Sequence, residues 1–522
     1  MKTAVAILGL VAAAAIAQNV PGSGPAAAPP IAIPLLRPAA STTASAPTSL
    51  PFTLGYDTTR ITKPLLPDGR PDYLAAINEM ASKGVTRDNN MAIAFLEVLD
   101  DQQFLGKPPL RDEILAKLDI SRPPEHLHFK NLAGIGDCDE AAARPWRSKE
   151  DPALADLLND MPLAAARGAT ERSRWYIPLV RSKEEVFLIR TRIPMLGQFR
   201  LVSKALVIHA NLAVGEGRQE DAPADLLAAH RLGCLLGQDP LLIGKLVAAS
   251  LVSSADKAIA DSAAAGAFSP ARARKLAEDL ISAGPMPDMA SAIDNCERFI
   301  ILDFIVQATG VDKGDLFEFL TTTLASGQTA KLKGNFFRQA FLKNWPKADY
   351  DTILRRVNQH YDDLVKAMGQ PSFGQRAKAI EDIGQQLSQL EDRVATQPAS
   401  TSPTQWTGDF ILSILLTRIS HSQISTDLAM VQRDLAVVAL GLCAYKADNG
   451  KYPDSLDVLA PKYLTKVPED FCSGKPFIYK KTADGYILYS VGENMTDDGG
   501  KTKGQGGDDI VVKTPSPAAT QP

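Results

Sequence analysis

The sequence predicts a mainly α-helical protein, in which a helical array or bundle is followed by a small α+β C-terminal domain with a three-stranded antiparallel sheet. Three observations predict this fold class. Apolar residues recur at three- and four-residue intervals through most of residues 61–400. Strand-like runs are concentrated after residue 470, around a Gly-containing turn. The 522 residues are 45% hydrophobic and 22% charged, a globular composition, and their length is typical of about two to four domains.

The charge balance and the hydropathy exclude two classes of protein. Lys and Arg number 56 against 60 Asp and Glu, for a formal net charge of −4. Because this balance provides no broad basic face, we expect no nucleic-acid partner. No apolar run approaches the roughly 20 residues that a spanning helix needs. We therefore exclude a polytopic membrane protein and expect no transmembrane span in the mature chain.

The first 60 residues are expected to lie outside the core. Residues 1–17 have a positive start, an uncharged apolar run and a small-residue ending at Ala15–Ala17, which is typical of a secretory signal peptide. The protein is therefore expected to be periplasmic or secreted, or anchored in the inner membrane if the signal is not cleaved. Residues 18–60 read as a Pro- and Ala-rich linker, and residues 514–522 as a disordered tail.

The helical domain is predicted to span residues 61–400. Its first helices are expected at 73–83 and 88–99. The clearest block, 198–282, is divided by Gly-containing breaks at 215–217 and 237–240, with an almost wholly apolar helix from Leu241 to Ala260. Ser269 and Pro270 provide an N-cap and a first helical position for the next helix. Helices are also expected at 351–366 and 375–394. This helix–turn–helix spacing resembles a tetratricopeptide-like stack but lacks a clear repeat.

The chemistry-bearing residues of this helical domain fit no catalytic motif. The chain has no G-x-S-x-G, H-E-x-x-H or P-loop sequence, so we predict no catalytic residue and leave open whether it is an enzyme. Four histidines stand singly on predicted helices and are expected to be core-edge or surface residues: His209, His230, His360 and His421.

The cysteines are odd in number, so at most two internal pairs can form. Cys234 lies in an apolar helix and is expected to be a small core residue. Cys443 and Cys472 belong to the same C-terminal segment and are the pair to test for a disulfide, which the exported compartment would permit. The other two cysteines are Cys138 and Cys296.

The C-terminal segment changes from helix to strand. Residues 405–447 are predicted to form one long helix, ended by Gly450. A short helix is expected at 455–459. Strands are expected at 477–479, 486–491 and 510–512, with a hairpin turn at 482–485 in which Gly485 takes a positive φ.

This segment resembles the major pseudopilin of bacterial type II secretion systems. The resemblance rests on the run Ala444–Pro453, whose Tyr-containing helix ends in D-N-G-K-Y-P, on Leu488–Gly492, which is similar to a following strand and turn, and on the Gly- and Asp-rich stretch Glu493–Asp509. It implies a pseudopilin-like domain over residues 405–513. The chain lacks the prepilin peptidase site and the long apolar N-terminal helix of those proteins. The whole chain also resembles a family of large exported helical bacterial proteins, which implies no particular activity.

The Gly- and Asp-rich stretch has the composition of a calcium loop. Residues 493–509 contain five acidic residues and two Lys, for a net charge of −3. Calcium prefers several oxygen ligands, which carboxylates and the carbonyls of a flexible loop can supply. The pseudopilin resemblance implies that the ligands are the Val491 carbonyl and the side chains of Asn494, Asp497, Asp498 and Asp508 or Asp509. The spacing is longer than in the pseudopilin loop and is not that of an EF-hand, and a flexible acidic loop is the alternative.

Three hypotheses of function follow. The first is a non-catalytic exported scaffold or binding protein that has an unidentified protein partner and a pseudopilin-like, calcium-stabilised C-terminal module. The second is an accessory component of a type II secretion or pilus-like apparatus. The third is an enzyme with an active site in the helical domain, which a pocket lined by converging polar groups would favour.

Overall fold

The computed structural model describes residues 50–121, 129–130, 132, 137–181, 186–188, 195–320, 335–396, 402–415 and 422–514. The predicted signal peptide, residues 18–49 of the predicted linker and residues 515–522 of the predicted tail lie outside the described residues. The described chain is mainly helical and ends in a three-stranded antiparallel sheet, which confirms the predicted fold class.

The helices fall into three groups along the chain. Short helices form the first group: α2 (Tyr73–Ser82), α3 (Met91–Phe95), α4 (Asp101–Leu105), α5 (Leu110–Lys117), α6 (Cys138–Ala143), α7 (Pro152–Asn159) and α8 (Leu163–Ala169). Long helices follow: α9 (Leu196–Gly215), α10 (Ala222–Leu236), α11 (Leu242–Ala264) and α12 (Pro270–Ser282). The third group contains α13 (Met289–Ala292), a π-helix (Ile293–Glu297), α14 (Arg298–Ala308), α15 (Lys313–Phe319), α16 (Asn335–Asn344), a 3-10 helix (Trp345–Lys347), α17 (Tyr350–Met368), α18 (Phe373–Thr396), α19 (Pro403–Leu415) and α20 (Ser422–Asn449).

Several helix starts are capped by short polar side chains. The Asp72 side chain accepts a hydrogen bond from the Ala75 amide at the start of α2, and the Asn90 side chain accepts one from the Ala92 amide at α3. These short side chains satisfy amide groups that have no partner within the helix. At α12, Ser269 and Pro270 occupy the predicted cap and first positions, but the Ser269 side chain makes no capping hydrogen bond.

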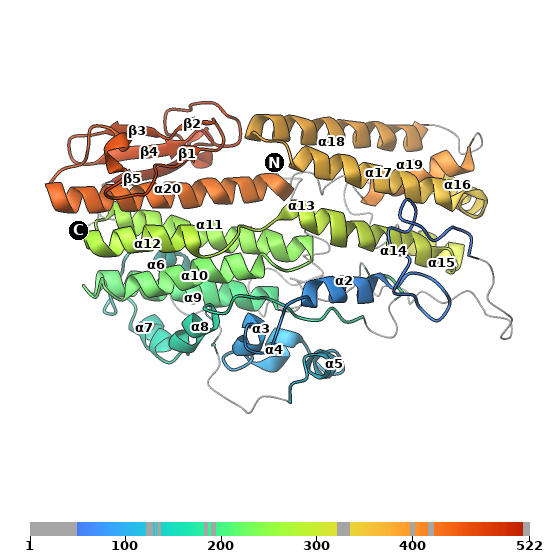
Figure 1. Cartoon of the computed structure of the whole chain (residues 1–522), viewed down its shortest axis with the longest axis horizontal. Coiled ribbons are helices and arrows are strands. Elements are labelled where there is room, and N and C mark those ends of the chain that lie inside the picture. The colour runs from blue at the N-terminus through green and yellow to red at the C-terminus, as the bar shows by residue number, and fades with distance from the viewer. Residues whose placement is uncertain are drawn as a thin grey trace.

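The long helices form stacked layers beneath the C-terminal sheet (Figure 1). The sheet lies over α20, which packs on α11 and α12, and α10 and α9 lie beneath these. Val437, Ala439 and Leu440 of α20 are wholly buried. The helix that carries the pseudopilin-like sequence therefore lies in the middle of the molecule, and it shares one continuous apolar core with the helical body.

Helix α20 is long and apolar enough to cross a membrane by length and composition alone. The sequence led us to expect no apolar run of spanning length, and Arg433 and Asp434 lie within this helix. In the structure, 67% of the most apolar window of α20 is buried inside the protein. A buried core helix passes the same test, so this property is weak evidence for a membrane span.

The predicted helix 405–447 is two helices, and this is a correction. Helix α19 packs with α16, α17 and α18, whereas α20 packs with α11, α12 and the sheet. Residues 416–421 between them lie outside the described residues. The apolar periodicity of both segments is helical, and such periodicity does not show that two successive helices bury their apolar faces in different parts of the core.

The C-terminal sheet has the order β3-β4-β5 and is antiparallel throughout. Strand β3 (Ile478–Lys481) pairs with β4 (Tyr486–Ser490), which pairs with β5 (Ile510–Thr514). A separate pair joins β1 (Glu469–Asp470) to β2 (Lys475–Pro476). Short 3-10 helices lie at Leu456–Leu459 and Lys503–Gln505.

The turn between β3 and β4 forms, but not for the predicted reason. Thr482 donates its amide to the Gly485 carbonyl at 2.9 Å, which closes the turn. Gly485 is not among the glycines with a positive φ. A Cβ atom at Gly485 would instead lie 2.0 Å from the Thr514 carbonyl oxygen of β5. Glycine is required here because a neighbouring backbone approaches closely.

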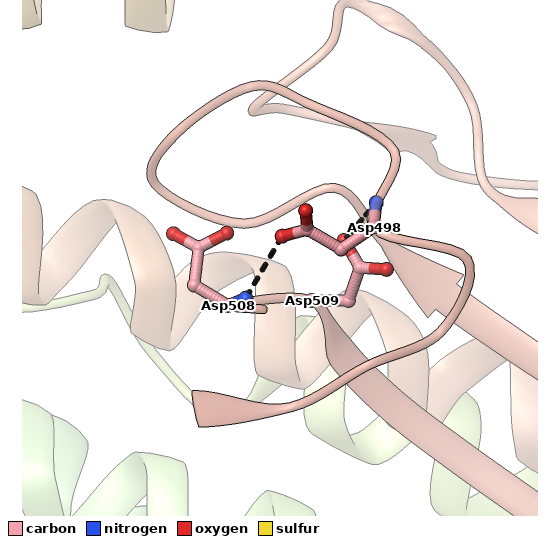
Figure 2. Close-up of side chains that lie close together, drawn as sticks. All are labelled: Asp498, Asp508 and Asp509. Atoms are coloured by element: carbon pink, nitrogen blue, oxygen red, sulfur yellow. Dashed lines mark hydrogen bonds between the residues drawn. The ribbon is translucent and has the colours of Figure 1, made fainter. Parts of the chain in front are cut away.

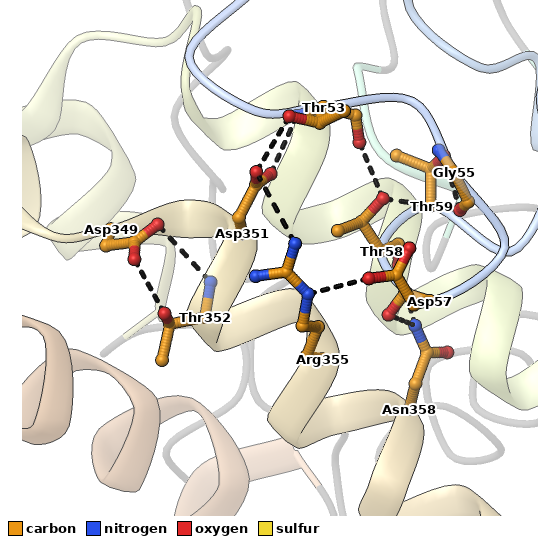
Figure 3. A network of polar contacts seen from close by, with 10 residues as sticks. All are labelled: Thr53, Gly55, Asp57, Thr58, Thr59, Asp349, Asp351, Thr352, Arg355 and Asn358. Carbon is orange, nitrogen blue, oxygen red and sulfur yellow. Dashed lines mark hydrogen bonds and ion pairs between the residues drawn. The ribbon is translucent and has the colours of Figure 1, made fainter.

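The end of the predicted linker is attached to the helical body. The Thr53 amide donates to Asp351 Oδ1 at 2.7 Å, and Arg355 Nε donates to Asp57 Oδ2 at 2.7 Å (Figure 3). Asn358 Nδ2 donates to the Thr58 carbonyl at 2.7 Å. Residues 50–60 therefore rest on α17 through several polar contacts that are distant in sequence.

All five cysteines are present as thiols. The Cys443 thiol donates to the Phe268 carbonyl at 3.5 Å, and burial raises the pKa of the Cys472 thiol to about 12. The pair singled out by the sequence is therefore not bonded in this structure. Cys234 is buried, as expected.

Candidate functional sites

The acidic loop is positioned by the edge of the C-terminal sheet. It leaves β4 at Ser490 and returns at β5, so both of its ends are held by paired strands. Gly492 directs the chain away from β4 with a φ of 70°. A Cβ atom at Gly492 would lie 2.3 Å from the Asp508 carbonyl oxygen, so the two ends of the loop approach each other at this glycine.

Three carboxylates of the loop converge at its base. Oxygen atoms of Asp498, Asp508 and Asp509 all lie within 4.8 Å of one another (Figure 2). Two oxygens bound to one calcium ion at about 2.4 Å lie at most about 4.8 Å apart. The spacing of these three side chains therefore fits a single calcium ion.

Backbone amides and side chains hold these carboxylates in place. Asp498 Oδ2 accepts hydrogen bonds from the Asp508 amide and from Asn494 Nδ2, each at 3.0 Å. Asp509 Oδ2 accepts from the Gly500 amide at 2.7 Å, and Asp508 Oδ2 accepts from the Asn494 amide at 2.9 Å. Asp509 is 3% exposed, and this burial raises the pKa of its carboxyl group against the opposing backbone hydrogen bonds.

One oxygen of this cluster has no partner among the residues that the structure describes. Asp508 Oδ1 is buried and accepts no hydrogen bond among the described residues. A buried carboxylate oxygen without a donor is costly, because it has lost its water without replacement. A cation bound between the three carboxylates would compensate this oxygen and would reduce the repulsion between like charges.

The other predicted ligands lie apart from this cluster or support it. Asn494 acts as a hydrogen-bond donor to Asp498 and Asp508. Asp497 is not in the cluster: its Oδ1 accepts from the Tyr489 hydroxyl at 2.9 Å and from the Gly499 amide at 2.8 Å, and these backbone and hydroxyl bonds lower the pKa of its carboxyl group. The Val491 amide donates to Asp470 Oδ2 at 3.3 Å. Of the predicted set, the structure brings together Asp498, Asp508 and Asp509.

A second polar cluster, which the sequence analysis did not identify, is buried between α10 and α11. His230 Nδ1 lies 2.7 Å from Asp256 Oδ1, and His230 Nε2 lies 3.4 Å from the Cys234 sulfur. His230 and Asp256 are wholly buried, and Cys234 is 2% exposed. Burial is the largest single influence and on its own would lower the pKa of His230, but the charges and hydrogen bonds of Asp256 and Cys234 together outweigh it, and the net result is a pKa of about 10.

The two helices approach closely enough to form this cluster because of Gly233. A Cβ atom at Gly233 would lie 2.6 Å from Val252 Cγ2 and 2.9 Å from the Val252 amide nitrogen. His230 and Cys234 are four residues apart and thus share one face of α10. This spacing was a readable signal for the pair, whereas Asp256 comes from another helix and only packing reveals it.

The same cysteine reaches a pocket on the molecular surface. The pocket has a volume of about 530 Å³ and is enclosed by the turn after α8, by α10 and by the loop after α12. Its lining includes Arg172, Ser173, Arg231, Cys234, Gln238 and Gly284. A pocket with converging polar groups is the feature that favours an active site in the helical body.

Comparison of the chain with protein-family models, with curated proteins and with solved structures finds no match. The likeness of residues 405–513 to a pseudopilin domain therefore stays a prediction.

Proposed function

We propose that this is an exported scaffold or binding protein whose pseudopilin-like C-terminal module is stabilised by calcium and engages a protein partner. The convergence of Asp498, Asp508 and Asp509 around a buried, unpartnered Asp508 oxygen carries the proposal. Export is supported by the N-terminal sequence, and exported proteins meet calcium at concentrations that weak oxygen sites can use.

Calcium acts on the connection between β4 and β5. The three carboxylates come from the two arms of the loop, and Asp509 directly precedes β5. An ion between them ties these arms together and fixes the surface that the loop presents. Since β4 and β5 also rest on α20, the ordered loop is supported by the core of the whole molecule.

Thermal unfolding of the full mature chain, with millimolar calcium and with chelator, tests the proposal. Ligand binding to the folded state alone, at 100 times Kd, stabilises by about 2.7 kcal/mol. We expect calcium to raise the Tm, and the increase to be lost in Asp508→Asn. Asp484→Asn is the matched control, because Asp484 is an exposed residue of the β3–β4 turn outside the cluster.

An unchanged Tm, together with no heat of calcium binding in titration calorimetry, would exclude the calcium role. Export is tested separately by cell fractionation and by N-terminal sequencing of the mature protein. A mature chain that begins at Gln18 supports the proposal, whereas a cytoplasmic protein that still begins at Met1 contradicts it.

A further inference from the structure

We propose that Cys234, His230 and Asp256 form a nucleophilic thiol site, which hydrolyses small carboxylate-bearing esters that enter the adjoining pocket. This inference goes beyond the proposed function, because it assigns a reaction to the helical body. It does not depend on the calcium loop, which lies on the opposite side of α11 and α20 in the sheet layer (Figure 1).

The order of the three groups is that of a nucleophile, a base and a group that orients the base. The two ring nitrogens of His230 face different partners: Nε2 faces the Cys234 sulfur at 3.4 Å, and Nδ1 faces Asp256 Oδ1 at 2.7 Å. A base held in this way by a carboxylate keeps one ring orientation and stabilises the positive charge that it acquires. His230 and Cys234 lie on α10 and Asp256 lies on α11, so two packed helices hold the three side chains in this order.

The surroundings of the histidine contribute mainly negative charge. Asp256 comes from α11, and its Oδ2 has no hydrogen-bond partner among the described residues. The Arg433–Asp434 pair of α20 interacts with Asp256: burial raises the pKa of the Asp434 carboxyl group, the charge and hydrogen bond of Arg433 lower it, and the negative charge of Asp256 raises it. The elevated pKa of His230 is consistent with an imidazolium that stabilises a thiolate.

The pocket indicates the class of substrate. Its lining contains two arginines, Arg172 and Arg231, and one acidic residue, Glu171, so the net charge of the lining is positive. Arg172 Nη1 donates to the Asp88 carbonyl, whereas Arg231 has no carboxylate partner within the described part of the chain. Because Arg231 is three residues before Cys234, it can bind a substrate carboxylate while the ester carbonyl lies at the sulfur.

The reaction is a hydrolysis in two steps. Cys234 reacts as the thiolate beside the His230 imidazolium: the sulfur forms a bond to the ester carbonyl carbon, and the bond from that carbon to the leaving oxygen breaks. The leaving oxygen takes the proton from His230. Water then attacks the thioester carbon, the S–C bond breaks, and the acid and the Cys234 thiol are produced. No oxidant or further reactant is required.

Alkylation of the full mature chain is the first test. We expect iodoacetamide near neutral pH to modify Cys234 at least about 10-fold faster than Cys138, as read by peptide mass spectrometry. Cys138 is half-buried and burial raises the pKa of its thiol, so it serves as the internal reference. Modification of Cys234 only after denaturation would overturn the proposal and would identify Cys234 as a core residue.

Turnover of activated esters is the second test. We expect p-nitrophenyl acetate to be hydrolysed with transient acetylation of Cys234, and mono-p-nitrophenyl succinate to be hydrolysed faster. Cys234→Ser should abolish both, and Cys138→Ser should change neither. Arg231→Gln should reduce the preference for the succinate ester over the acetate ester by about fivefold. Ester turnover that survives Cys234→Ser, with no acylated Cys234 peptide, would overturn the proposal.

Discussion

The loop at the sheet edge and the polar cluster between α10 and α11 hold negative charge in opposite ways. In the loop, Asp498, Asp508 and Asp509 place like charges together, and backbone amides stabilise them only in part. Between the helices, Asp256 faces His230, so the charges match within the protein. The comparison teaches that the first arrangement leaves the repulsion between its carboxylates uncompensated within the described residues, whereas the second places a basic side chain against its carboxylate.

The largest expected effect concerns removal of the buried carboxylate. Asp256→Ala leaves the buried His230 without its counter-charge, and breaking such a pair costs about 3–5 kcal/mol of unfolding free energy. Asp498→Ala, in the half-buried loop without calcium, should cost about 1 kcal/mol or less. Urea unfolding of both variants measures the difference. Equal losses in the two variants would remove the distinction between the regions.

The pH dependence of stability separates the regions further. Because the pKa of His230 is raised to about 10 in the folded protein, its contribution to stability is complete below its usual 6.5 and is lost as pH rises through about 10. The slope is at most about 1.4 kcal/mol per pH unit. The carboxyl group of Asp509 also has a raised pKa, so its contribution is lost as pH rises in the acidic range above 3.8.

Urea unfolding of the wild type and of His230→Asn, from roughly pH 5 to pH 10, measures the contribution of His230. This range covers the usual and the raised pKa of the histidine. Above pH 6.5, the usual pKa of histidine, the free energy of unfolding of the variant should change less with pH than that of the wild type. A wild-type curve that rises toward alkaline pH would contradict the pairing of His230 with Asp256.

Calcium should affect only one of the two regions. At 100 times Kd we expect about 2.7 kcal/mol of stabilisation and slower hydrogen exchange at the Gly500 and Asp508 amides. Amides near His230 should exchange at an unchanged rate in the same sample. Equal protection of both regions would show that calcium acts on the whole molecule and not through the loop.

The smallest expected difference, about 1 kcal/mol, is between two variants in the backbone of the loop. Gly492→Ala combines a φ of 70° with a contact of 2.3 Å to the Asp508 carbonyl and should cost about 2 kcal/mol. Gly506→Ala has a φ of 84° in open space and should cost about 1 kcal/mol. Thermal unfolding of the two variants tests whether the close approach matters beyond the positive φ, and equal Tm values would show that it does not.

Local patterns in the sequence predicted much of the fold. The helix periodicity and the strands at 486–491 and 510–512 depend on residues close in the chain, and each was predicted from the sequence. The same holds for the acidic loop, whose composition indicated oxygen ligands. The role of Gly485 was misread, because its close neighbour at Thr514 belongs to another strand.

The sequence by itself therefore determined the fold class and the acidic composition of the loop, because neighbouring residues fix local structure through short-range contacts. Only the tertiary structure decided that α20 lies in the core, that Asp498 meets Asp508 and Asp509, and that Asp256 meets His230. These contacts join residues on different arms or helices, and their geometry depends on how closely the elements pack, as at Gly233.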